Sequence, residues 1–212
     1  MANWLTQANG FAFRIVHRQN LSGVLASGLH ARNAPGASSS YVNIGNAELI
    51  DKRGRRVVPI PPAGVLNNYV PFYFTPFSPM AYNIKTGYNV TKRPNDDIII
   101  LVAKYADLVA AGLTVIYTDR HAYLQAARYF SGSASLGQID WPLLQSRSFK
   151  RDPSDPEKMD RYQAELLVHG HVPLTALNAI VTHSAAVREE VQNAVDEAGC
   201  GLKVTAVPGI YF

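Results

Sequence analysis

The sequence predicts an α+β fold, because short strands outnumber long helices and the two do not alternate regularly along the chain. Two apolar runs, 97–103 and 113–118, have the composition of buried strands. The chain has 212 residues, of which 47% are hydrophobic, and this is enough for a large core. We therefore expect one domain over residues 1–212, with two packed, mostly antiparallel β-sheets and helices around them.

The first third of the chain contains a strand, a helix and a polar loop. Residues 11–17 alternate between faces as a strand does. Asn20 is a residue type that caps helices, and the apolar spacing after it predicts a helix that Gly28 helps to end. Residues 31–41 are small and polar, which indicates a surface loop.

The stretch 65–80 is rich in aromatic residues and prolines. Val70, Phe72 and Phe74 recur with the period of a strand. Prolines at 71, 76 and 79 each lack a backbone donor and fix φ, so we expect them to keep this segment out of a regular central sheet. The result would be a rigid aromatic elbow, suited either to plugging the core or to holding a flat ligand ring.

The rest of the chain continues the mixture of short elements. We expect a helix over 106–112, a helix capped by Asp119 that runs to Phe130, a flexible loop over 131–137 and one or two helical turns over 139–146. A charged, proline-punctuated loop over 148–161 leads to a strand over 163–169. A strand over 179–182, a helix between Ser184 and Gly199 and a strand over 203–207 complete the chain.

Composition and motifs exclude several classes of function. The net charge of +4 and the pI near 9.2 are compatible with a nucleic-acid partner. Cys200 is the only cysteine, so a disulfide within the chain and a cysteine-rich metal site are excluded. His169 and His171 share a strand face, but no third ligand is suggested nearby, and we expect no metal. The apolar runs are too short to span a membrane and the N-terminus lacks a signal-peptide pattern, so we expect a cytoplasmic protein without membrane contact.

Glu165 is the most informative charged residue. It interrupts an otherwise apolar strand, where an unpaired carboxylate is costly to bury. It must face solvent, find a partner or face a cleft, and the polar loop that leads into it favours a functional role. Arg53 lies in a basic run, where a solvated loop and a contact to an anionic ligand are the alternatives.

Taken together, these segments resemble the DarT family of toxins, which are NAD-dependent ADP-ribosyltransferases acting on single-stranded DNA. The resemblance covers nearly the whole chain. It rests on Arg53 and on the order and spacing of the segments 13–21, 43–50, 69–80, 118–121, 138–141, 161–165 and 209–212. It implies an ADP-ribosyltransferase fold, with two packed sheets around an NAD cleft.

The resemblance also implies roles for individual residues. Glu165 matches the catalytic glutamate, which bonds the nicotinamide ribose and favours its positively charged state as nicotinamide leaves. Arg53 matches an arginine between NAD and the DNA base, with a part in both NAD binding and catalysis. The cofactor-binding positions that match are Arg14, His17, Asn20, Leu21, Arg53, Tyr73, Met80 and His121. Arg14 is a departure, because some relatives have histidine there.

By the same resemblance, the segment of about 146–161 is the substrate-recognition loop, here called the recognition loop. Arg147, Lys150 and Arg151 are candidates for phosphate contacts, and Phe149 and Tyr162 are candidates for stacking on a base.

The expected activity is transfer of ADP-ribose from NAD to thymine in single-stranded DNA. The alternatives are a guanine-directed enzyme, a protein- or RNA-directed transferase and a non-catalytic DNA-binding module. The resemblance implies a toxic activity and a DarG-type macrodomain antitoxin as partner. A monomer is expected, because the chain shows no long exposed apolar helix face.

Overall fold

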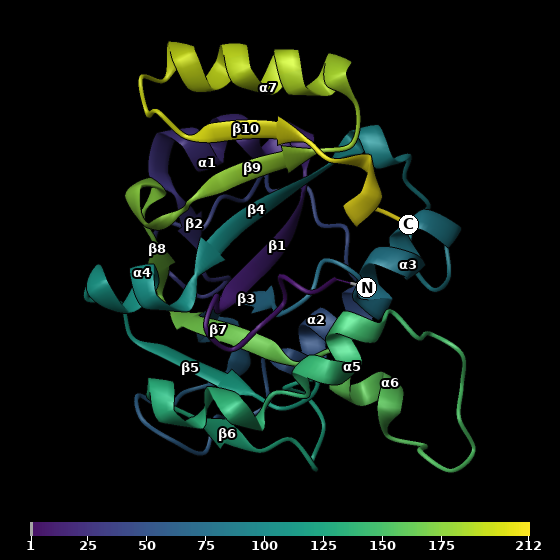
Figure 1. Ribbon diagram of the computed structural model, residues 1–212. Coiled ribbons are helices and arrows are strands. Elements are labelled where there is room, and N and C mark those ends of the chain that lie inside the picture. Colours follow the sequence, from purple (N-terminus) through teal and green to yellow (C-terminus); the bar gives the residue numbers. More distant parts are fainter. Residues whose placement is uncertain (1) are drawn as a thin grey trace.

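The computed structural model describes residues 2–212. Within this part of the chain, the strands form a main sheet of eight and a separate pair (Figure 1). The main sheet has the order β10-β9-β4-β1-β3-β7-β5-β6, and its neighbours are antiparallel except for β9 and β10. Its strands are β1 (Phe11–His17), β3 (Tyr69–Tyr73), β4 (Ile98–Lys104), β5 (Val115–Thr118), β6 (Tyr129–Phe130), β7 (Glu165–His169), β9 (Ala179–Thr182) and β10 (Lys203–Ala206). The pair is β2 (Leu29–His30) with β8 (His171–Val172).

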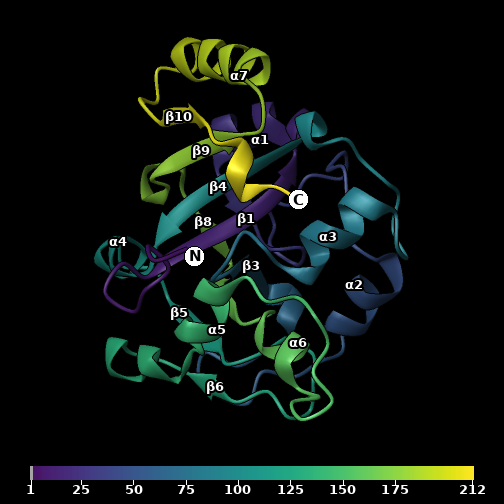
Figure 2. The same ribbon diagram turned by 45° about the vertical axis from the view of Figure 1, so that its right-hand side comes forward.

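Short helices cover this sheet. They are α1 (Leu21–Ser27), α2 (Ala47–Arg53), α3 (Pro79–Thr86), α4 (Tyr105–Ala110), α5 (Trp141–Ser146), α6 (Lys158–Arg161) and α7 (Ala185–Glu197). The longest, α7, confirms the helix predicted between Ser184 and Gly199, and Ser184 caps it by accepting from the Val187 amide at 3.3 Å. It lies over β9 and β10. Figure 2 shows α2, α3 and α6 on the same side of the molecule. No helix in residues 2–212 has the length and hydropathy of a membrane span.

The backbone pairing of the main sheet is least extensive at its centre, between β1 and β3. β1 pairs with β4 along its whole length and β3 pairs with β7 along its whole length, but β1 meets β3 only at Phe13 and Tyr73. The sheet therefore divides into the halves β10-β9-β4-β1 and β3-β7-β5-β6. This arrangement confirms the predicted α+β fold class, with its two mostly antiparallel layers.

We expected the prolines of the stretch 65–80 to keep it out of a regular central sheet, but β3 lies at the centre of the main sheet. The prolines do not exclude the segment from the sheet, because β7 supplies a full partner on one side. On the other side β1 diverges, so the missing donor of Pro71 removes no bond from a continuous ladder. Arg14 Nη1 donates instead to the free carbonyl of Pro71 at 3.1 Å.

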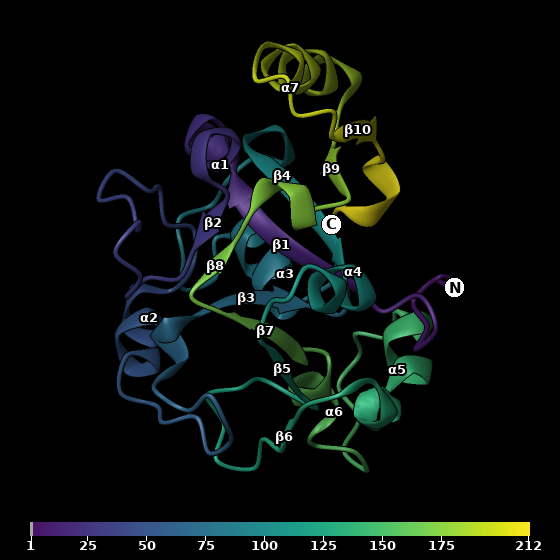
Figure 3. The same ribbon diagram turned by 90° about the vertical axis from the view of Figure 1, so that its left-hand side faces the viewer.

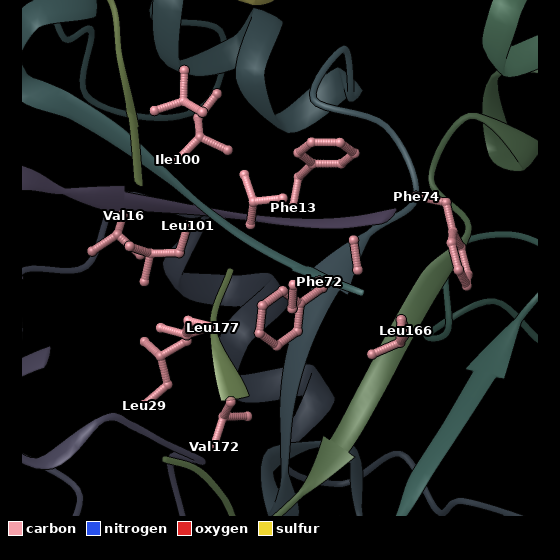
Figure 4. Packing of buried hydrophobic residues seen from close by; sticks show 14 of the residues in the cluster. Phe13, Val16, Leu29, Phe72, Phe74, Ile100, Leu101, Leu166, Val172 and Leu177 are labelled. Carbon is pink, nitrogen blue, oxygen red and sulfur yellow. The ribbon is translucent and has the colours of Figure 1, made fainter. Parts of the chain in front are cut away.

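The core lies between the sheet halves and the helices that cover them. Phe13, Phe72, Leu101 and Leu166 come from four strands and Phe74 directly follows β3, and each is at most 3% exposed (Figure 4). β4 is buried on both faces over 98–103, which explains its continuous apolar run. The core fixes the position of β3 against β7, where the site described below begins.

Two predicted elements are wrong. Residues 119–128 form a loop, not a helix, because the Asp119 carboxylate accepts from the Arg128 amide at 3.0 Å and from its Nε at 2.8 Å. Tyr129–Phe130 then pairs with β5 as a strand. The expected flexible loop is largely a 3-10 helix over Ser133–Gln138.

Asn20 precedes α1 as predicted, but its side chain makes no bond to the first turn. It exchanges two hydrogen bonds with the Val42 backbone instead, at 2.8 and 2.9 Å. It therefore fastens the segment that follows β2, which Figure 3 shows at the outer edge of the molecule.

Candidate active site

A cleft of about 670 Å³ opens beside β3 and β7. Residues from β1, α1, the segment after β2, α2 and α3 line its walls. Arg53, Tyr73, His121 and Glu165 are among its lining residues, although they are far apart in the sequence.

Glu165 is the first residue of β7 and is 1% exposed. Its Cα is paired with that of Tyr73 on β3, so the two side chains leave the same face of the sheet. The Glu165 amide donates to Thr118 Oγ1 at 3.3 Å, which ties this end of β7 to β5. Two neighbouring strands thus hold the carboxylate in place.

Arg53 reaches Glu165 from the end of α2. Asn46 begins this helix by accepting from the Leu49 amide at 2.9 Å, and a surface pair between Glu48 and Lys52 supports it. The Arg53 guanidinium then donates from Nη1 to Glu165 Oε1 at 2.9 Å and from Nη2 to Oε2 at 2.8 Å. This is a buried, bidentate ion pair, which defines the relative position of the two groups.

The loop after β5 supplies the remaining contacts to Glu165. The Ala122 amide donates to Oε1 at 3.0 Å, and His121 Nδ1 lies 3.3 Å from the same oxygen. That nitrogen also accepts from the Tyr123 amide at 3.1 Å, so a neutral His121 carries its proton on Nε2.

The environment shifts the pKa values of these groups. Burial alone would raise the pKa of Glu165, but the charge and hydrogen bonds of Arg53, together with the Ala122 amide, hold it below its ordinary value. Burial lowers the pKa of His121 and outweighs the opposing charge of Glu165, so the ring is neutral near pH 7. Burial and then the charge of Glu165 raise the pKa of Tyr73, whose phenol stays protonated.

The structure brings most of the predicted cofactor-binding residues to this cleft. Arg14, Asn20, Tyr73 and Met80 line it together with Arg53 and His121. The Tyr73 hydroxyl points to Met80 Sδ at 3.6 Å, whereas Phe72, Phe74 and Phe77 of the same stretch are buried in the core.

His17 and Leu21 are not among the lining residues. They border a separate depression of about 460 Å³ with Arg18, Arg93 and Asp97. His17 is the last residue of β1, and its ring accepts from the Gln19 amide at 3.2 Å instead of reaching the cleft.

No group of three or more metal-ligating side chains occurs in residues 2–212. The His169–His171 pair that the sequence suggested is divided in the structure. His169 contacts the edge of Tyr69, with ring centroids 5.1 Å apart, whereas His171 stacks on His30 at 4.3 Å.

Comparison with known proteins identifies the family. A family model described as the single-stranded DNA thymidine ADP-ribosyltransferase DarT matches residues 13–212. This chain belongs to the DarT family. A DNA ADP-ribosyl transferase of Escherichia coli is 42% identical over 209 residues, which cover 98% of this chain and 96% of that protein.

Solved DarT structures agree with this assignment. Thermus sp. 2.9 DarT in complex with ADP-ribosylated single-stranded DNA has a TM-score of 0.88 and 32% identity, over 97% of both chains. The same protein in complex with NAD+ has a TM-score of 0.83 and 33% identity, over 96% of this chain and 98% of that one. The chain is therefore an ADP-ribosyltransferase of the DarT family in both sequence and fold.

In this DarT-family chain the predicted DNA contacts of the recognition loop do not line the cleft. Lys150 and Arg151 are exposed, and neither is within ion-pair distance of a carboxylate in the described residues. Arg147 is also exposed, and its guanidinium lies 3.8 Å from the centre of the Phe77 ring. These cations remain candidates for phosphate contacts.

The aromatic residues of the loop have structural partners. Phe149 packs against Tyr162 at 5.2 Å and Phe212 at 5.2 Å, measured between ring centroids. Tyr162 is fully buried and donates from its hydroxyl to the Leu143 carbonyl at 2.8 Å. The expectation that Tyr162 stacks on a base is therefore wrong for this conformation, because the core covers its ring.

The recognition loop is fastened at its base by two cations. Lys158 is 9% exposed, and its ammonium group donates to Ser148 Oγ at 2.8 Å and to the Lys150 carbonyl at 2.9 Å. Arg161 binds the Asp140 and Asp155 carboxylates. These contacts join the two ends of the loop to each other and, through Asp140, to the start of α5.

Gln163 and His30 are two polar residues of the cleft that sequence reasoning did not single out. Gln163 lines it from the turn that precedes β7, where the alternation of a strand does not apply. His30 also lines it, and its buried Nε2 has no partner within residues 2–212. No local pattern distinguishes His30 from a surface histidine.

Proposed function

We propose that this chain transfers ADP-ribose from NAD to thymine in single-stranded DNA and releases nicotinamide. The observation that carries the proposal is the buried Arg53–Glu165 pair on the wall of a cleft in a DarT-family chain. A buried ion pair usually stabilises a fold no better than apolar residues of the same size would, because both charges lose their hydration. A role in function is therefore the better explanation for this pair.

The carboxylate has one acceptor position free for a substrate. A carboxylate offers about four lone-pair sites. Oε1 accepts from Arg53 and Ala122, whereas Oε2 accepts from Arg53 alone. A ribose hydroxyl can donate to the remaining site of Oε2 without breaking the ion pair. The charge of Glu165 then lies close to the positive charge that develops on the ribose as its bond to nicotinamide breaks.

Arg53 serves the acceptor side of the reaction. Burial disfavours its charge, but the Glu165 carboxylate outweighs this effect and raises the pKa of Arg53. The guanidinium therefore stays charged and acts as a hydrogen-bond donor, not as a proton acceptor. It can stabilise the negative charge that develops on the carbonyl oxygen of the base as the ring nitrogen attacks the ribose carbon, the bond to nicotinamide breaks and the proton of the ring nitrogen passes to water.

The cleft walls fit an anionic dinucleotide. Arg14 Nε and His30 Nε2 are buried nitrogen atoms without a partner in residues 2–212, and both residues line the cleft. Unpaired buried polar groups of this kind are costly and mark positions where a ligand supplies the missing bond. Tyr73 and Met80 offer apolar surface for a flat ring beside them.

The biological setting follows from family membership. We infer that residues 1–212 act as a single transferase domain, as a monomer in the cytoplasm, where NAD and DNA are available. A bulky anionic adduct on a template base would block replication, so the activity is toxic. A DarG-type macrodomain antitoxin is the expected partner.

The test is incubation of the purified chain with NAD and short single-stranded oligonucleotides, each lacking one base. Mass spectrometry should find one added ADP-ribose on every oligonucleotide except the one without thymine. If only the oligonucleotide without guanine failed to react, the target base would be guanine instead of thymine. If only protein or RNA were labelled, the acceptor would not be DNA.

The matched control is Glu165→Gln, which keeps the shape of the side chain and removes its charge. We expect it to bind NAD and to transfer no ADP-ribose at a measurable rate. Transfer at the wild-type rate would refute the role of the carboxylate. Arg53→Lys keeps a positive charge but not the bidentate geometry, and it should also lose most of its activity.

A further inference from the structure

Two exposed tyrosines lie on α3 and just after it. Tyr82 is 52% exposed and Tyr88, just beyond the helix, is 65% exposed. The other large apolar side chains that are exposed in residues 2–212 lie singly on different elements, at Trp4, Val57 and Val109. Two exposed aromatic rings, one on α3 and one just after its end, therefore stand out from the rest of the surface.

Two exposed lysines accompany these tyrosines. Lys85 lies in the last turn of α3. Lys92 lies next to the end of the helix: its Cβ is 3.1 Å from the position that a Cβ would occupy on Gly87, the residue after the helix. Neither lysine is within ion-pair distance of a carboxylate in residues 2–212, whereas Lys52 and Arg161 do have such partners. We call Tyr82, Lys85, Tyr88 and Lys92 the α3 surface.

The α3 surface is continuous with the cleft. Met80 and Asn83 of the same helix line the cleft, and so does Val90, which lies between Tyr88 and Lys92 in sequence. A chain that leaves the cleft over α3 therefore meets the two tyrosines directly.

The α3 surface is also joined to the recognition loop. The ring of Phe212 contacts Tyr82 at 5.7 Å and Phe149 at 5.2 Å, measured between centroids. Figure 2 shows α3, the C-terminal end and the chain between α5 and α6 on the same side of the molecule. Lys150 and Arg151 directly follow Phe149 in the sequence, so the exposed cations of the loop come next to the ring that contacts Phe212 and, through Phe212, Tyr82.

We propose that the α3 surface binds the nucleotides that flank the target base, with bases stacked on Tyr82 and Tyr88 and phosphates held by Lys85 and Lys92. This inference rests on the proposed function, because it extends the path of the same DNA strand. Alternating aromatic rings and unpaired cations are the combination that binds single strands without reading their sequence. A duplex offers its bases only inside the stack, so the exposed rings favour a single strand.

The test compares a short substrate with a long one. Both carry the same target base and its nearest neighbours, in oligonucleotides of about four and about sixteen nucleotides. We expect Tyr88→Ala to raise KM for the long substrate about fivefold to tenfold, with kcat unchanged and with wild-type kinetics on the short one. Tyr88→Phe keeps the ring and should behave as wild type on both.

The lysines give an independent readout. Lys85→Ala with Lys92→Ala should weaken binding of the long substrate and reduce the slope of log Kd against log salt by about 0.7 for each phosphate that the variant no longer neutralises. The matched control is Lys203→Ala, an exposed lysine on β10 that also has no ion-pair partner in residues 2–212. It should leave affinity and salt slope unchanged.

The outcomes separate this inference from the proposed function. Wild-type KM of Tyr88→Ala on the long substrate would overturn the inference and leave the α3 surface to a protein partner. An equal loss on both substrates would also overturn it, because it would indicate damage to the cleft. Failure of the wild-type chain to modify any oligonucleotide would refute the proposed function and, with it, the DNA path over α3.

Discussion

Replacing Arg53 by alanine should destabilise the protein strongly and change the sign of its pH dependence. The substitution removes both hydrogen bonds from the guanidinium and leaves Glu165, which is 1% exposed, with only the Ala122 amide and the nearby His121. Removing one member of a buried ion pair costs about 3–5 kcal/mol, because the other charge stays buried without compensation. We expect a loss of this size in the free energy of unfolding at pH 8.

The pH dependence follows from the pKa of Glu165. In the wild type this pKa is below its ordinary value, so the pair contributes stability above about pH 4.5 and loses it as pH falls through the lowered pKa. Without Arg53, burial dominates and the pKa of Glu165 rises above its ordinary value. The variant therefore takes up a proton on Glu165 when the pH falls, and its deficit relative to wild type becomes smaller at pH 5 than at pH 8.

The assay is urea unfolding of both proteins at pH 8 and pH 5, followed by circular dichroism. Arg55→Ala is the matched control, because Arg55 is exposed two residues away and should change stability by less than about 0.5 kcal/mol. The double variant Arg53→Met/Glu165→Leu should recover most of the loss, since apolar residues replace both charges. A deficit below about 1 kcal/mol at pH 8, or one that grows on acidification, would refute this reasoning.

Three further predictions concern other parts of the molecule. The fold lowers the pKa of His121, so below about pH 6.5 the unfolded chain binds more protons than the folded one and the free energy of unfolding decreases as the pH falls. Urea titrations of His121→Gln should show a smaller decrease, by up to about 1.4 kcal/mol per pH unit. Lys158→Ala should increase deuterium exchange of the recognition loop while Lys203→Ala does not, and equal exchange in both would contradict the anchoring role. Gly28 has φ +76° and no room for a Cβ, so Gly28→Ala should lower stability in thermal unfolding by more than about 2 kcal/mol. Gly23 lies inside α1 with open space around it, so Gly23→Ala should raise stability by about 0.5–1 kcal/mol.

The elements that sequence predicts well are those whose signals are local. The buried strand at 98–104 follows from its apolar run, and α7 follows from the Ser184 cap, the spacing of its valines and the final Gly199. The helix expected after Asp119 fails for the opposite reason. Its apolar spacing is helical, but Asp119 binds Arg128, nine positions along, and Arg56 donates to the Leu124 carbonyl at 2.9 Å from a distant segment. Such contacts override local propensity.

By itself, the sequence determined the fold class and singled out Glu165, because a carboxylate in an apolar strand is costly to bury without a partner. The resemblance of the sequence to the DarT family indicated the chemistry. Only the tertiary structure decided how that carboxylate is held. Arg53 and Glu165 are 112 positions apart, and they meet because α2 ends beside the first residue of β7. It also decided which residues reach the cleft: Gln163 does and His17 does not. Side-chain direction at a strand end depends on packing between distant segments, and no local pattern in the chain records it.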